Sequence, residues 1–146
     1  MSILVNDIEI SDAEVGQEMQ HHPAPSQERA WQMAAQSLVV RQLLLQQAAS
    51  NGLDPEQAEE DVIDQLLQQE VAVPEADEAT CQRFYDAHPN SFMDEDSGKR
   101  LTFDQTEDHI RDYLHAKAMR MAVAEYIKAL SYSADIRGYE LSSPGM

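Results

Sequence analysis

Residues 26–52, SQERAWQMAAQSLVVRQLLLQQAASNG, decide the fold because they predict one long helix. Ser26 can accept a hydrogen bond from the free N–H groups of the first turn, and Glu28 places negative charge near the positive end of the helix dipole. Gly52 can adopt the left-handed conformation that ends a helix. No proline or glycine interrupts the stretch between these signals. At about 1.5 Å per residue the helix would span roughly 40 Å, the width of a small domain.

The apolar residues of this helix cover most of its circumference, so we expect other elements to surround it. It is therefore predicted to be the central helix of a small helical domain. These apolar positions are Ala30, Trp31, Met33, Ala34, Leu38, Val39, Leu43, Leu44, Leu45 and Ala48.

The length and composition predict a single domain covering residues 1–146. A chain of 146 residues with 42% hydrophobic content can bury a substantial core, and only five glycines argue against a turn-rich all-β fold. We expect the cytoplasm, because no signal peptide, membrane-spanning run or pair of cysteines is present and Cys81 is alone.

The charge is strongly negative and unevenly distributed. A net charge of −17 argues against nucleic acid and anionic membranes as partners. Residues 1–80 hold 16 acidic and 2 basic residues, whereas residues 81–146 hold 11 and 8. The acidic half could attract basic segments of a partner, although a solubilising surface explains it more simply.

Short elements are predicted before the long helix. Residues 3–10, ILVNDIEI, read as a small hairpin or a kinked strand with Asn6 and Asp7 in the turn. Ser11 can cap a first helix, which the prolines at 23 and 25 end.

Two further helices are predicted after it. Asp54 is expected to cap an amphipathic helix with Pro55 in its first turn. Asp77 is expected to cap a short helix that ends near His88, with Phe92 folding back onto it. Residues 93–101 are predicted to be a loop.

A second long helix is predicted from about Phe103 to Ser131, with Thr102 and Gln105 as its capping box. Residues 134–141 alternate like a strand that would pair with the N-terminal one. The predicted fold class is therefore mainly α, with about five helices around a long central helix and short, paired terminal strands. The expected buried side of the second long helix comprises Ile110, Leu114, Ala118, Met121, Ala122 and Leu130, widened by Tyr113, Tyr126 and Ile127.

The sequence offers no catalytic, metal-binding or cofactor-binding motif. None of the five histidines is spaced four residues from another, and Cys81 has no CxxC partner. The acidic run at residues 94–96 lacks the spacing of a calcium loop, and no glycine-rich phosphate loop is present.

Methionine and aromatic residues give the clearest indication of function. Methionine side chains repack at low cost, so a surface rich in them tolerates varied partners, although such residues also fill cores. We expect client contacts at Trp31, Met33, Tyr113, Met119 and Met121, in an apolar cleft between the long helices.

The order of elements and several local stretches resemble the SurA N-terminal chaperone module of parvulin-type peptidyl-prolyl isomerases, in particular the NifM-like group. The resemblance covers nearly the whole chain. It is carried by residues 18–24 (EMQHHPA), 38–49 (LVVRQLLLQQAA) with Gly52 and Leu53, 85–92 (YDAHPNSF), 110–130 and 136–141 (IRGYEL).

The chain departs from that family where the parvulin domain, of on the order of a hundred residues, would be inserted. Only residues 93–101 connect the flanking parts, so no catalytic residue of the family can be carried over. The resemblance implies a non-catalytic chaperone or assembly factor that binds unfolded or partly folded clients, such as nitrogenase or nitrate reductase components. The alternatives are a dimeric adaptor or regulator with one fixed protein partner and, third, a residual isomerase. A homodimer that exchanges terminal strands or the last helix is plausible.

Overall fold

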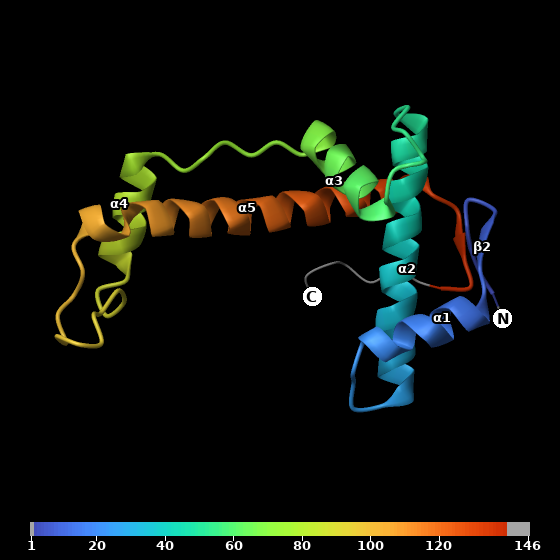
Figure 1. Cartoon of the computed structure of the whole chain (residues 1–146), viewed down its shortest axis with the longest axis horizontal. Coiled ribbons are helices and arrows are strands. Elements are labelled where there is room, and N and C mark those ends of the chain that lie inside the picture. The colour runs from blue at the N-terminus through green and yellow to red at the C-terminus, as the bar shows by residue number, and fades with distance from the viewer. Residues whose placement is uncertain (1, 140–146) are drawn as a thin grey trace. The chain divides into compact units, whose positions relative to one another are not determined.

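The computed structural model describes residues 2–139 and is mainly helical (Figure 1). Its contacts divide the chain into two compact units. The first unit comprises residues 1–71 and 123–146, and the second comprises residues 72–122. The longest helix, α5 (Phe103–Ser133), contributes residues to both units.

A three-stranded antiparallel sheet begins the first unit, in the order β2-β1-β3. The predicted hairpin is confirmed: β1 (Ile3–Val5) pairs with β2 (Ile8–Ile10). The turn residues Asn6 and Asp7 have φ of 50° and 69°, as a two-residue hairpin turn requires.

The predicted pairing of the two ends of the chain is also confirmed. Strand β3 (Ile136–Arg137) lies beside β1, with Leu4 opposite Arg137 and Val5 opposite Ile136. The last two residues of the predicted strand, Glu140 and Leu141, lie outside the described residues.

The first two α-helices of the first unit begin where the capping signals predict. The side chain of Ser11 accepts from the Glu14 N–H at the start of α1 (Asp12–Glu18), which continues into the 3₁₀ helix η1 (Met19–His21). The central helix α2 (Gln27–Ser50) begins after Ser26, whose hydroxyl accepts from the Arg29 N–H at 3.1 Å. It ends before Gly52, which has a φ of 80°.

Two apolar clusters of the first unit pack on α2. One joins the sheet and α1 to the N-terminal half of the helix, through Ile3, Val5, Ile10, Val15, Ala34, Ala35, Val39 and Leu43. The other joins α3 (Glu59–Glu70) and the end of α5 to its C-terminal half, through Leu44, Ala48, Val62, Leu66 and Ile127.

The expectation that other elements surround α2 on all sides is wrong. Met33 is 36% exposed, and Arg29, Gln32 and Arg41 are exposed as well. The helix has a continuous buried side of small and branched residues, and the sheet and the neighbouring helices cover that side only.

The predicted start of α3 is also wrong. The carboxylate of Asp54 accepts from the Glu56 N–H at 2.9 Å and so caps a tight turn, whereas α3 begins at Glu59 without a side-chain cap. The Gln57 side chain exchanges hydrogen bonds with the side chain of Gln65.

The second unit contains α4 (Glu78–Ala87) and the first part of α5. Asp77 caps α4 as predicted, and hydrogen bonds from Thr80 lower the pKa of its carboxyl group. The predicted capping box of α5 is confirmed: the Thr102 N–H donates to the Gln105 side chain, and the Gln105 N–H donates to the Thr102 hydroxyl. Burial raises the pKa of the Cys81 thiol on the inner face of α4.

An aromatic cluster holds the connection between α4 and α5. Phe92 packs on Phe84 and Tyr85, as predicted, and the guanidinium of Arg100 lies 3.7 Å from the centre of the Tyr85 ring. The predicted loop at residues 93–101 contains an antiparallel bridge between Met93 and Arg100. It is therefore a short, ordered hairpin.

The expected buried side of α5 is correct at its two ends and wrong at its middle. Ile110 and Ile127 are buried, whereas Met121 is 64% exposed and Tyr113 is 45% exposed. No residue between Arg111 and Tyr126 is buried, although the segment is rich in apolar side chains.

Candidate functional site

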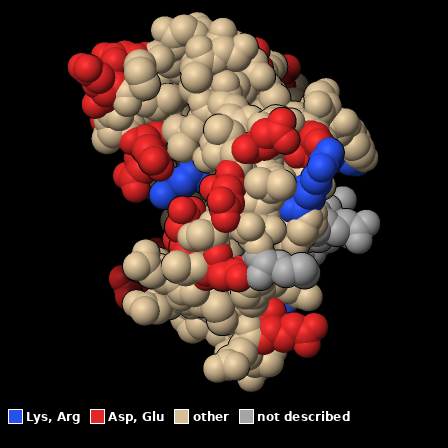
Figure 2. All heavy atoms as spheres, turned by 90° about the vertical axis from the view of Figure 1, so that its right-hand side faces the viewer, with Lys and Arg blue, Asp and Glu red and all other residues tan. Residues whose placement is uncertain are grey.

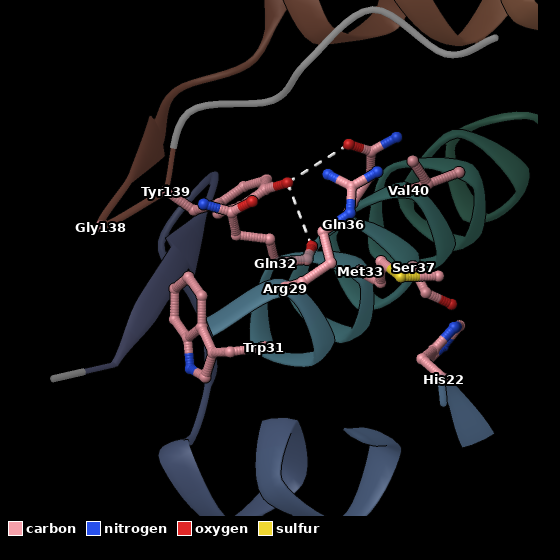
Figure 3. Close-up of a pocket in the computed structure, with 10 residues that line it drawn as sticks. All are labelled: His22, Arg29, Trp31, Gln32, Met33, Gln36, Ser37, Val40, Gly138 and Tyr139. Atoms are coloured by element: carbon pink, nitrogen blue, oxygen red, sulfur yellow. Dashed lines mark hydrogen bonds between the residues drawn. The ribbon is translucent and has the colours of Figure 1, made fainter. Parts of the chain in front are cut away.

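A groove of about 750 Å³ lies on the first unit, against the uncovered side of α2 (Figure 3). Its floor is made by residues three and four positions apart, which share one face of a helix. These residues are Arg29, Gln32, Met33, Gln36, Ser37 and Val40.

The segment after β3 forms one wall of the groove. The Tyr139 hydroxyl lies 3.3 Å from the Gln32 carbonyl oxygen and 3.3 Å from Gln36 Oε1, and it donates toward both (Figure 3). The Tyr139 ring meets the edge of Trp31, with ring centres 6.0 Å apart. The wall thus joins residues more than one hundred positions apart in the sequence.

Gly138 allows the chain to enter this wall. Its φ is 83°, and a Cβ atom at this position would lie 2.7 Å from the Ser2 carbonyl oxygen. Only glycine combines this backbone conformation with such a close approach to β1, so Gly138 sets the position of Tyr139.

His22 lies at the other border of the groove, directly after η1. Its Nε2 atom is 3.1 Å from the Glu18 carboxylate, one helical turn earlier in the chain. This contact orients the His22 imidazole, and it also gives the Glu18 carboxylate a hydrogen-bond partner.

The charge of the lining contrasts with that of the whole chain. Within residues 2–139, the lining includes Arg29 and no aspartate or glutamate, whereas the chain carries a net charge of −17. On the face of the molecule seen in Figure 2, acidic side chains are widely spread and basic ones are few. The other described lining residues carry amide, hydroxyl, imidazole and apolar groups, which can bind polypeptide backbone and side chains together.

Two of the five expected contact residues lie in this groove. Trp31 is partly buried at its wall, and Met33 is exposed on its floor. Tyr113, Met119 and Met121 belong to the second unit and line neither this groove nor the smaller pocket described below. All five side chains are at least partly exposed.

The sequence interpretation missed most of the polar lining. The spacing of Arg29, Gln32, Gln36 and Ser37 along one helix face was a usable signal for the floor. No local pattern indicates Tyr139, because its position depends on the pairing of β3 with β1.

A second, smaller pocket of about 220 Å³ lies where α2 and α3 meet in the first unit. Its lining is mainly apolar and includes Leu45, Leu53 and Val62. Val62 belongs to the second apolar cluster, and Leu45 and Leu53 pack against that cluster. We therefore interpret this pocket as a gap at the edge of the core.

Other chemically notable groups lie outside the groove. Burial, together with Glu70, raises the pKa of the Tyr126 phenol. Among residues 2–139, no three His, Cys, Asp or Glu side chains are grouped to hold a metal ion. Within the same residues, no helix is long and apolar enough to cross a membrane.

Comparison with known proteins gives no match to a family model, to a curated protein or to a solved structure.

Proposed function

We propose that this protein is a non-catalytic chaperone or assembly factor that holds extended segments of client polypeptides in the groove on α2. The observation that carries the proposal is the mixed lining of this groove. Met33, Trp31 and Val40 offer apolar contacts beside the side chains of Gln32, Gln36 and Ser37.

This combination suits an extended polypeptide for a physical reason. Unpaired backbone N–H and C=O groups of a client need partners when they leave water, and amide side chains can both donate and accept. Client side chains vary in shape, and the flexible thioether of Met33 can adapt to them at low cost. The volume of about 750 Å³ is within the range of pockets that bind drug-sized ligands.

The proposal is tested by diluting chemically denatured proteins into buffer with and without an equal molar amount of this chain. We expect reduced light scattering for several unrelated test proteins, because the groove would cover their exposed apolar segments. An unrelated acidic protein of similar charge is the control for nonspecific effects of charge.

The substitution Met33→Ala tests whether clients bind in the groove. Removing this exposed side chain would cost about 1 kcal/mol of contact with a bound segment, which weakens client binding about fivefold. Met93→Ala is the matched control, because Met93 is also exposed but lies in the second unit. Equal activity of the two variants would contradict the assignment to the groove.

A dimeric adaptor with one fixed partner is the second candidate. The middle of α5 favours it, since Tyr113 and Met121 expose apolar surface there. If scattering is unchanged for every test protein, the holding function is contradicted and this candidate takes its place.

A further inference from the structure

We infer that the groove on α2 selects client segments with an acidic side chain, which the Arg29 guanidinium binds, although the chain itself is strongly acidic. The inference rests on the proposed function and specifies which clients the same groove prefers.

Arg29 differs in its ion pairing from Arg41 and Arg137, the other two arginines of its unit. Arg29 and Arg41 are the only two basic residues in positions 1–80, where 16 acidic residues occur. Arg41 pairs with Glu59 at 3.5 Å, and in the last part of the unit Arg137 pairs with Asp135 at 3.1 Å. Among the described residues, no carboxylate lies within ion-pair distance of Arg29. Lys128, which also lacks an ion pair among the described residues, is not among the groove-lining residues.

The surroundings of Arg29 leave its charge available to a ligand. The described residues that line the groove include no carboxylate, and Glu18, which is close to its border, is hydrogen-bonded to His22 at 3.1 Å. In Figure 3 the Arg29 side chain extends along the floor toward Gln36. A guanidinium can donate two parallel hydrogen bonds to one carboxylate, and neighbouring amides can complete the site.

The net charge of −17 does not override this local preference. At physiological ionic strength the Debye length is about 8 Å, so carboxylates elsewhere on the surface act only weakly on a ligand in the groove. A contact at about 4 Å between Arg29 and a client carboxylate is screened much less. If the charge of the whole chain decided binding, basic segments would bind best. If Arg29 decides it, acidic segments bind best.

The test uses the fluorescence of Trp31, which is the only tryptophan and lies in the wall of the groove. Three short peptides share one sequence of Val, Gln and Ser residues, with a central Glu, Gln or Lys. Both ends are blocked, so that a terminal carboxylate cannot substitute for the side chain. We expect the Glu peptide to bind about threefold more tightly than the Gln peptide, as is typical of an exposed ion pair, and the Lys peptide to bind most weakly.

Substitutions at Arg29 test whether this residue causes the preference for the Glu peptide. Arg29→Gln should abolish the difference between the Glu and Gln peptides, and Arg29→Glu should reverse the order of the Glu and Lys peptides. Arg41→Gln is the matched control on the same helix and should keep the preference. Raising the salt concentration should reduce the preference as well.

The outcomes separate this inference from the function on which it rests. If the Gln peptide binds as tightly as the Glu peptide, or the Lys peptide binds best, the acidic preference is overturned and the holding function stands. If none of the peptides binds, both are overturned. A preference that persists in Arg29→Gln also overturns the role of Arg29.

Discussion

At the scale of single residues, Gly138 connects the sheet to the groove. Its φ is 83°, and a Cβ atom at this position would lie 2.7 Å from the Ser2 carbonyl oxygen, so there is no space for a side chain. We expect Gly138→Ala to lower the free energy of unfolding by about 1–3 kcal/mol, through backbone strain and the displacement of β1. The same displacement should change the fluorescence of Trp31, since Tyr139 packs on its ring.

Gly16→Ala is the matched control for this prediction. Gly16 lies inside α1, and a Cβ atom there would have no neighbour within 4 Å. Alanine should therefore stabilise the helix by about 0.5–1 kcal/mol. Chemical denaturation of both variants measures the two effects. Equal stability of the two variants would contradict the role given to Gly138.

At the scale of elements, the hydroxyl of Ser26 secures the start of α2, the helix on which the groove is built. Ser26→Ala removes the acceptor for the Arg29 N–H and should lower the free energy of unfolding by about 1 kcal/mol. Ser26→Asp should retain the stability of the parent chain, because its carboxylate can accept the same hydrogen bond and interacts favourably with the helix dipole.

The unfolding of both Ser26 variants can be followed by circular dichroism at the helix band. Unchanged stability in Ser26→Ala would show that the cap contributes nothing. In that case the start of α2 would be set by packing of Ala30 and Ala34 on the unit's core alone.

The elements that could be predicted from the sequence are those with local signals. Caps such as Ser26 and Thr102, and the turn at Asn6, act on residues only a few positions away, so their effect can be read along the chain. Asp54 shows the limit of this reasoning, because the same side chain caps a turn as readily as a helix.

The features that could not be predicted depend on distant contacts. The periodicity of α2 and α5 identifies helices, but it does not show which neighbours cover them. For example, the periodicity of α5 predicts a buried position for Met121, whereas this side chain is exposed. For the groove, Trp31 and Met33 were identified from residue type, whereas Tyr139 required the pairing of β3 with β1.

At the scale of the whole molecule, the two compact units have separate cores, and each can be perturbed by one substitution. Leu66 is fully buried in the first unit, and Ile110 is fully buried in the second. Truncation of either side chain to alanine should destabilise its own unit by about 2–5 kcal/mol, through lost apolar contacts and the cavity left behind.

Trp31 distinguishes the units, because it is the only tryptophan and belongs to the first. We expect Leu66→Ala to shift the fluorescence transition to lower denaturant. Ile110→Ala should leave that transition in place and shift only part of the circular dichroism signal, which reports helices of both units. If Ile110→Ala moves the fluorescence transition as far as Leu66→Ala does, the units unfold as one cooperative body. The stability of the groove on α2 would then depend on the second unit as well as on the first.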